Sequence, residues 1–212
     1  MKLYSMIDSG NSYKVRLLLA KLNLAYEHIA TSSRDGSTRT QEFLTKNPIG
    51  KVPLLELADG RFVAESNAIL LYLADGSSFI PVDRYDRAKL YEWLFFEQYS
   101  HEPNVAVRRA LKTYPERAAQ ATSERLAQTL AGGVHALSVM EHRLEKAPFL
   151  VGDAPTIADI SLYAYTHDAE TGGFNLGDYP AVSAWLERIA AEPRHVPMRD
   201  PRLLAAPTVG VG

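Results

Sequence analysis

A change of pattern near residue 76 does most to limit how this chain can fold. Before it, apolar spacing predicts alternating strands and helices: a strand at 2–7, a helix at 12–22, a strand at 26–29, then a helix, a hairpin at 54–57 and 61–63, and a helix after Ser66. After it, every periodic segment is helical. We therefore predict an α/β domain at residues 1–76, a linker at 77–86 and an all-α domain at 87–212.

Long helices account for the second domain. They are expected at 87–99, 122–144, 157–165 and 179–191. Pro103 should kink the chain after the first of them, because an interior proline removes a helical hydrogen bond. One stripe of the 122–144 helix is assigned to the core and not to a cofactor site; it consists of Leu126, Leu130, Leu137, Met140 and Leu144.

Thr156 and Asp159 have the spacing of a capping box at the start of the third of these helices. The Thr156 hydroxyl would accept a backbone N–H of the first turn, while Asp159 reaches back to the Thr156 N–H. Asp159 is therefore predicted to serve folding and not catalysis.

Charge and hydropathy exclude several classes of function. The formal net charge of −2 gives no basic surface for nucleic acid or an anionic membrane. No stretch approaches the ~20 apolar residues of a membrane-spanning helix, and the chain opens as a strand and not as a signal peptide. We expect a cytoplasmic protein.

A metal site is not expected. The chain has no cysteine, and its six histidines lack the His-x-x-x-His spacing of a helical zinc pair. A nucleophile elbow and a phosphate loop are absent from the sequence as well.

The junction Glu65-Ser66 precedes the last helix of the first domain. Backbone N–H groups at a helix start have no intrahelical partner, so with the Ser66 hydroxyl they can bind a carboxylate. Glu65 could then bind a neighbouring amino group. The alternative is that Ser66 only caps the helix.

Val52-Pro53 opens the first hairpin strand. A cis bond there would turn the Val52 backbone outward to pair with an extended peptide, although the base rate for X-Pro bonds favours a trans strand start. With Glu65 and Ser66, this outlines a pocket for a small anionic peptide.

Residues 8–12 lie between the first strand and its helix, so hydroxyls there face the positive helix end. A bound thiol at this place would be stabilised as thiolate by the helix and by a hydroxyl hydrogen bond. Ser9 and Ser12 are the candidates, and plain helix capping is the alternative for both.

Four segments in order resemble the soluble glutathione transferase family over residues 1 to about 193: 9–16, 47–55, 65–73 and 152–161. The resemblance implies a thioredoxin-like first domain, a cis peptide bond at Val52-Pro53, and Glu65 and Ser66 at the γ-glutamyl end of glutathione. Lys51 and Arg39 match positions near the glycine carboxylate or its loop.

Within this family the chain is similar to serine-type members. Ser9 falls where such members activate the thiol, and Asn11, with Ser12 beside it, falls near the cysteine of bacterial cysteine-type members. Because cysteine is absent, mixed-disulfide chemistry through a protein thiol is excluded. Tyr4 comes too early to be the tyrosine of tyrosine-type members and is interpreted as core or strand surface.

The resemblance implies an enzyme that adds the glutathione thiolate to a small apolar electrophile, or that uses it in reductive dehalogenation or hydroperoxide reduction. Glutathione is the co-substrate, no metal or other cofactor is required, and a homodimer is expected. A non-catalytic binding or assembly module of the same fold is the alternative.

The electrophile site, expected in the cleft between the domains, is not defined by the sequence. His101, Arg108, Tyr163, Tyr165 and His167 are candidates, but ordinary packing or exposure is the favoured interpretation for each. The segment 205–212 would either cover the cleft or have no role.

Overall fold

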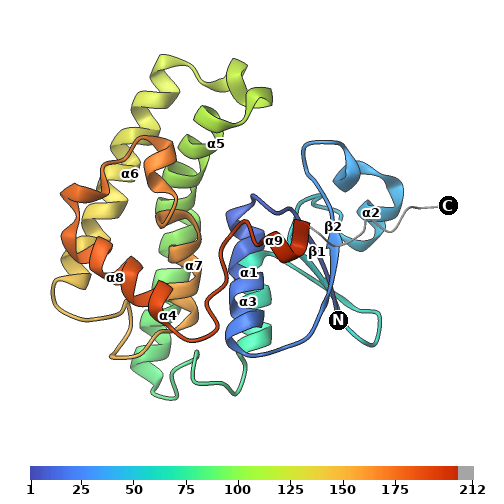
Figure 1. Ribbon diagram of the computed structural model, residues 1–212, viewed down its shortest axis with the longest axis horizontal. Helices are drawn as coiled ribbons and strands as arrows, with labels where there is room; N and C mark the ends of the chain where they lie inside the picture. Colours follow the sequence, from blue (N-terminus) through green and yellow to red (C-terminus); the bar gives the residue numbers. More distant parts are fainter. Residues whose placement is uncertain (205–212) are drawn as a thin grey trace. The chain divides into compact units, whose positions relative to one another are not determined.

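The computed structural model describes residues 1–204 (Figure 1). They divide into two compact units. The first unit comprises residues 1–73 together with the C-terminal segment that begins at Pro193, and the second unit comprises residues 74–192. The predicted tail at 205–212 lies outside the described residues.

A four-stranded sheet forms the centre of the first unit. Its elements are β1 (Lys2–Ser5), α1 (Gly10–Lys21), β2 (Glu27–Ala30), the 3₁₀ turn η1 (Ser37–Arg39), α2 (Gln41–Lys46), β3 (Leu54–Glu56), β4 (Phe62–Ala64), α3 (Ser66–Ala74) and α9 (Pro201–Leu204). The strand order is β2-β1-β3-β4. β2 is parallel to β1, and β3 is antiparallel to both β1 and β4.

Successive strand residues point to opposite sides of the sheet, and helices pack against the apolar residues on both sides. On one face, Leu3 and Leu55 pack with Val15 of α1 and Ile69 of α3, all fully buried; Figure 1 shows these two helices side by side. On the other face, Tyr4 and Leu54 pack with Phe43 of α2.

Helices alone build the second unit. They are α4 (Arg84–Phe96), the π-helical segment η2 (Glu97–Ala106), α5 (Val107–Thr113), η3 (Pro115–Gln120), α6 (Ser123–Leu144), α7 (Ile157–Thr166), η4 (Ala169–Gly172), η5 (Leu176–Asp178) and α8 (Pro180–Ala191). Every residue of α7 is buried, so this helix forms the core of the unit. The predicted class, α/β followed by all-α, is confirmed.

The capping box at the start of α7 is present as predicted. Asp159 is fully buried and accepts hydrogen bonds from the N–H groups of Thr156 (2.8 Å) and Leu150 (3.0 Å) and from the Trp185 indole (3.0 Å). Burial raises the pKa of the Asp159 carboxyl. The residue thus ties three segments of the second unit together, which is a folding role.

The structure adds detail to the prediction for Pro103 and corrects the one for Leu130. Pro103 lies inside the π-helical segment η2, which joins α4 to α5 and whose wider turn accommodates a residue that cannot donate. Leu130 is 37% exposed, so it is not a core residue. Gly133 belongs to the buried face of α6, and a Cβ added there would lie 2.3 Å from the Phe174 ring.

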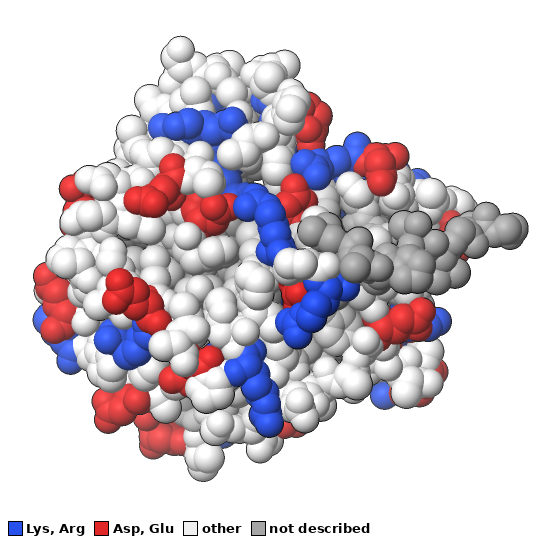
Figure 2. Space-filling model, viewed as in Figure 1, with Lys and Arg blue, Asp and Glu red and all other residues white. Residues whose placement is uncertain are grey.

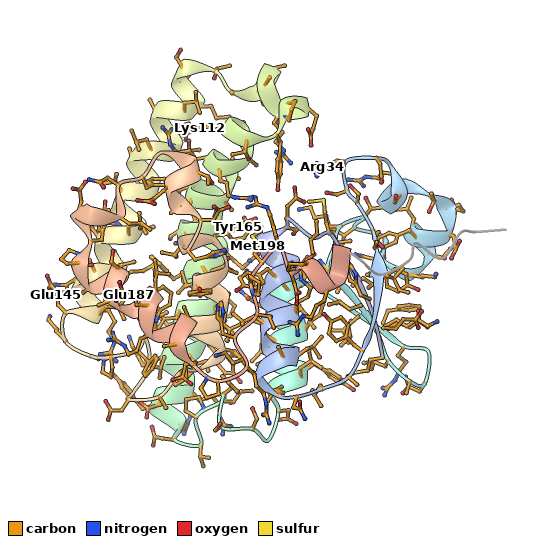
Figure 3. The ribbon with its side chains drawn as sticks, viewed as in Figure 1. Arg34, Lys112, Glu145, Tyr165, Glu187 and Met198 are labelled. Atoms are coloured by element: carbon orange, nitrogen blue, oxygen red, sulfur yellow. The ribbon has the colours of Figure 1, made fainter. Side chains whose placement is uncertain are left out.

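Residues 193–204, here called the C-terminal strap, pack on α1 of the first unit. The Tyr13 hydroxyl donates to the Val196 carbonyl (2.7 Å), and Arg16 Nη2 donates to the Met198 carbonyl (2.9 Å). Met198 is labelled in Figure 3. The sequence predicted these residues as part of the helical domain, so the second unit ends earlier than expected, at Glu192.

No helix in residues 1–204 has the length and apolar character needed to cross a membrane. Acidic and basic side chains are interspersed over the face of the molecule that Figure 2 presents.

Candidate active site

Three loops of the first unit meet at one edge of its sheet. Tyr4 of β1 pairs with Leu54, the first residue of β3, which in turn pairs with Ala64, the last residue of β4. In antiparallel pairs, the end of one strand therefore lies beside the start of the next. The turn after β1, the Val52-Pro53 segment before β3 and the Glu65-Ser66 junction after β4 share this edge.

Ser9 occupies the N-cap of α1. Its backbone is extended (φ −85°, ψ 121°), and its Oγ accepts the Ser12 N–H at 3.3 Å. A hydroxyl that accepts through its lone pair still has its hydrogen to donate. Ser9 is 9% exposed, so it is at the boundary between the interior and the sheet edge. This geometry suits a donor to an anion bound beside the positive end of α1.

Ser12 and Asn11 differ in their surroundings. Ser12 is fully buried, and its Oγ accepts the Met6 N–H at 3.2 Å, which fixes the turn between β1 and α1. Asn11 is half-buried, and its Oδ1 accepts the Ser66 hydroxyl at 3.1 Å. The structure thus brings Asn11, but not Ser12, to the start of α3.

Glu65 and Ser66 form the start of α3. The Glu65 carbonyl accepts the Ile69 N–H at 2.9 Å, so Glu65 holds the N-cap position and Ser66 is the first helical residue. The Ser66 hydroxyl is therefore not the helix cap. Glu65 is exposed and has a left-handed backbone (φ 67°), a conformation that costs a non-glycine residue roughly 1–2 kcal/mol. Such strain is concentrated at functional sites.

Lys14, which the sequence analysis did not select, joins this group. Its Nζ donates to the Ser66 Oγ at 3.3 Å, and the residue is fully buried. The chain Lys14–Ser66–Asn11 thus links α1 to α3 through side chains. It also places a positive charge beside the backbone N–H groups at the start of α3, where an anion is favoured.

The loop before β3 presents free backbone groups. The Val52-Pro53 peptide bond is cis, as the family resemblance implies. Within residues 1–204, the Val52 N–H and C=O have no hydrogen-bond partner. Asn47, also missed by sequence reasoning, holds the loop: its Nδ2 donates to the Lys51 carbonyl at 2.8 Å, and its Oδ1 accepts the Ile49 N–H at 3.2 Å.

Arg39 and Lys51 are exposed cations of this same loop region. Arg39 Nη1 donates to the Ile49 carbonyl at 3.4 Å and lies against Gly50. Gly50 has a left-handed backbone (φ 65°), and a Cβ there would approach the Thr38 carbonyl to 2.9 Å. Only glycine therefore allows the two segments to approach this closely.

Tyr4 is a core residue, as interpreted from the sequence. It is 9% exposed, and its hydroxyl donates to Glu56 at 2.7 Å. Burial and this hydrogen bond raise the pKa of the Tyr4 phenol.

The five electrophile-site candidates in the second unit are packed. His101 is fully buried with Nε2 at 2.9 Å from the Thr166 Oγ1, and Arg108 donates to the Gly172 and Leu126 carbonyls. Tyr163 and Tyr165 are buried, and the His167 ring stacks on Tyr163 at 5.1 Å. Ordinary packing, the favoured interpretation, describes all five.

No group of three or more His, Asp or Glu residues that could hold a metal ion occurs in the described part of the chain.

Comparison with known proteins gives consistent matches. The family model for the glutathione S-transferase N-terminal domain matches residues 1–75, and the model for the C-terminal domain matches residues 96–193. A crystal structure of a glutathione S-transferase from Pseudomonas fluorescens is 49% identical, with a TM-score of 0.91, and covers 94% of this chain and 98% of its own.

Two further relatives are informative. The disulfide-bond oxidoreductase YfcG of Escherichia coli is 31% identical over 86% of this chain and 87% of its own length. The glutathione transferase URE2P6 from Phanerochaete chrysosporium, solved in complex with oxidized glutathione, is 26% identical with a TM-score of 0.81 over 91% of each chain.

Proposed function

The chain belongs to the glutathione S-transferase family, and from this premise we propose that its first unit binds glutathione, ionises the thiol and adds the thiolate to a small apolar electrophile. It is an enzyme of this family, so the non-catalytic module is set aside. Reductive dehalogenation and hydroperoxide reduction would start from the same thiolate and are alternative outcomes of the same site.

The observation that carries this proposal is the Lys14–Ser66–Asn11 chain at the start of α3. The Ser66 hydroxyl accepts from Lys14 and donates to Asn11, so an anionic group would take this hydrogen in place of the Asn11 Oδ1, with the Lys14 ammonium beside it. We assign the γ-glutamyl carboxylate to Ser66 and the first N–H groups of α3, and the neighbouring amino group to the exposed Glu65 carboxylate.

The remaining contacts follow from the shared sheet edge. The Val52 N–H and C=O would pair with the cysteinyl backbone of the tripeptide, as an added strand does. Arg39 and Lys51 would approach the glycine carboxylate. The complex of the Phanerochaete relative with oxidized glutathione supports glutathione as the ligand class.

Thiol activation is assigned to Ser9, with Asn11 as the second candidate. The thiol proton leaves to solvent, and the Ser9 hydroxyl donates to the sulfur anion next to the start of α1. Lowering a thiol pKa from ~8.5 to below 7 requires roughly 2 kcal/mol, which one charge-assisted hydrogen bond and the helix end can supply. The thiolate then forms a C–S bond with the electrophile, and the leaving group departs with its electron pair.

Calorimetric titration with reduced glutathione, followed by the pH dependence of the bound thiolate's ultraviolet absorbance, tests the proposal. Saturable binding with a thiolate that forms below pH 7 would support it. An absence of binding at millimolar glutathione would overturn it.

Reduction of small disulfides is a second candidate, favoured by the name of the Escherichia coli relative. Because this chain has no cysteine, both reducing thiols would have to come from glutathione. The first thiolate displaces one thiol and forms a mixed disulfide, and a second glutathione thiolate attacks that disulfide to give glutathione disulfide and the second thiol. Formation of glutathione disulfide, and not of a thioether, would identify this reaction.

A homodimer is part of the proposal. Three exposed aromatic side chains, Tyr91, Phe95 and Tyr99, are spaced four residues apart along α4 and η2, and the exposed Leu130 and Val134 follow the same spacing on α6. η2 packs on α6 within the second unit. Clustered exposed apolar side chains of this kind mark an interaction surface.

A further inference from the structure

A cavity of about 480 Å³ lies in the first unit between α1, β2 and the C-terminal strap. We call it the strap pocket. The lining side chains used below are Arg16, Tyr26, His28, Arg194, Asp200 and Arg202. It includes none of the residues assigned to the glutathione site. Its volume falls within the range of small-molecule sites, about 300–1,000 Å³.

The lining carries an excess of positive charge. Three arginines face one carboxylate, that of Asp200. Asp200 is already engaged, since both of its oxygens accept the Arg202 Nε (2.9 and 3.0 Å) and Oδ2 also accepts the Arg202 Nη2 (2.6 Å). The charges of Arg16 and Arg194 are therefore not offset within the lining.

Arg16 is held rigidly. Its guanidinium donates to the Ser5 hydroxyl and to the carbonyls of Met6, Ile7 and Met198, at 2.8–3.2 Å, and all four acceptors are neutral. Burial lowers the pKa of Arg16 to about 10, so the group stays charged at neutral pH. A buried guanidinium held by neutral oxygens keeps a positive field in the pocket.

Among residues 1–204, three non-glycine residues have a left-handed backbone, and two of them line this pocket: Asn23 (φ 56°) and Arg194 (φ 59°). The third is Glu65 in the candidate active site. Asn23 follows the C-cap of α1, where the Asn23 and Leu24 N–H groups bond to the Ala20 and Leu19 carbonyls, so its conformation is that of an ordinary helix end. The left-handed backbone of Arg194 lies in the strap itself.

Apolar groups complete the lining. Ala20, Val196, Pro197 and the Tyr26 ring contribute the apolar part. Burial lowers the pKa of His28, whose Nε2 lies 2.8 Å from the Ser5 hydroxyl, so this ring is neutral near pH 7. A lining that combines cationic and apolar groups fits a molecule with an anionic head and an apolar body.

We propose that the strap pocket is a second ligand site, which binds a small organic anion with a carboxylate or phosphate head on an apolar body. We assign the head group to the exposed Arg194, because the one hydrogen bond that its guanidinium makes within residues 1–204 is long, 3.5 Å to the Lys21 carbonyl. Binding here would not depend on glutathione chemistry.

The test uses the isotope-labelled full chain with glutathione present at saturation. Phenyl phosphate and phenylacetate are titrated separately, with phenol as the neutral analogue, and backbone amide shifts are followed by NMR. We expect saturable shifts at Asn23, His28 and the strap. Arg194→Gln should raise the Kd about 10-fold, as for the loss of one charge-assisted hydrogen bond. The control is Arg199→Gln, an exposed strap arginine that does not line the pocket.

Binding by either anion that Arg194→Gln weakens and Arg199→Gln leaves unchanged supports the site, and the stronger anion identifies the head group. The proposal is overturned if neither anion gives saturable shifts, if phenol binds equally well, if both variants weaken binding alike, or if the shifts map to Ser9 and Ser66.

Discussion

The Ser9 hydroxyl serves two purposes in the proposed site, as the cap of α1 and as a donor to the thiolate. Ser9→Ala should leave the Kd for glutathione within about twofold and raise the pKa of the bound thiol by about 1–2 units, the equivalent of one charge-assisted hydrogen bond. Absorbance of the bound thiolate against pH measures this. An unaltered titration would transfer the role to Asn11, for which Asn11→Ala is the matching variant.

Ser66 anchors the carboxylate end in the same proposal. Ser66→Ala should raise the Kd for glutathione about 10-fold, because a hydrogen bond to a charged group is lost. Calorimetry gives the Kd, and Ser37→Ala is the control, since the Ser37 hydroxyl bonds to the exposed Asp35 in the same unit. If the variant binds glutathione with the same Kd as the unaltered chain, Ser66 does not bind the carboxylate.

Residue spacing could predict Ser9, the Val52-Pro53 segment and Glu65-Ser66, because each stands at an element boundary that is visible in the sequence. Lys14 and Asn47 could not be predicted in this way. Lys14 has its role through Ser66, which is 52 positions away along the chain. The role of a buried polar side chain depends on the group that it contacts. Lys14 meets Ser66 only when the fold brings α1 and the start of α3 together, so the sequence does not show this contact.

The loop between α2 and β3 depends on the absence of a side chain at Gly50. Gly50→Ala combines a left-handed backbone with a Cβ 2.9 Å from the Thr38 carbonyl, so it should destabilise the fold by more than the ~1 kcal/mol of the conformational cost alone and weaken glutathione binding. Urea unfolding and calorimetry measure the two effects.

Gly60→Ala is the matched control for that change. Gly60 also has a left-handed backbone (φ 82°), but nothing lies within 4 Å of an added Cβ. Equal losses of stability in the two variants would show that the contact with Thr38 is unimportant.

The capping box of α7 allows a prediction for the second unit. Thr156→Ala should lower the free energy of unfolding by roughly 1 kcal/mol, because a backbone N–H at the helix start loses its acceptor. Thr156→Ser keeps the hydroxyl and should restore most of the loss. If the alanine variant is as stable as the original in urea unfolding, the box is not stabilising α7.

Most helices and strands followed from apolar periodicity and from end signals such as Thr156. The exceptions are positions where a neighbour distant in sequence decides. Gly133 lies on the buried face of α6 with the Phe174 ring beside it, whereas Leu130 is 37% exposed. Because a glycine has no apolar side chain, the apolar pattern of α6 does not mark Gly133 as buried. The same pattern marks Leu130 as buried although it is exposed.

At the scale of the whole molecule, the strap is the feature that sequence did not predict. Its contacts with α1 join residues 182 and 183 positions apart, Arg16 with Met198 and Tyr13 with Val196. Prolines interrupt the strap, so no periodic pattern reports which unit it packs on. Only the assembled first unit provides the donors, the Tyr13 hydroxyl and the Arg16 guanidinium, that bond to the strap carbonyls.

The oligomeric state tests the proposed interaction surface on α4, η2 and α6. Sedimentation velocity should give about twice the chain mass of 23.5 kDa. Phe95→Asp places a charge at the centre of the aromatic row and should shift the protein to the monomer, because burying an unpaired carboxylate is costly. Val82→Asp, also exposed but outside the row, should remain dimeric. A monomeric unaltered chain, or dissociation by both variants alike, would mean that these aromatic side chains are exposed for a reason other than self-association.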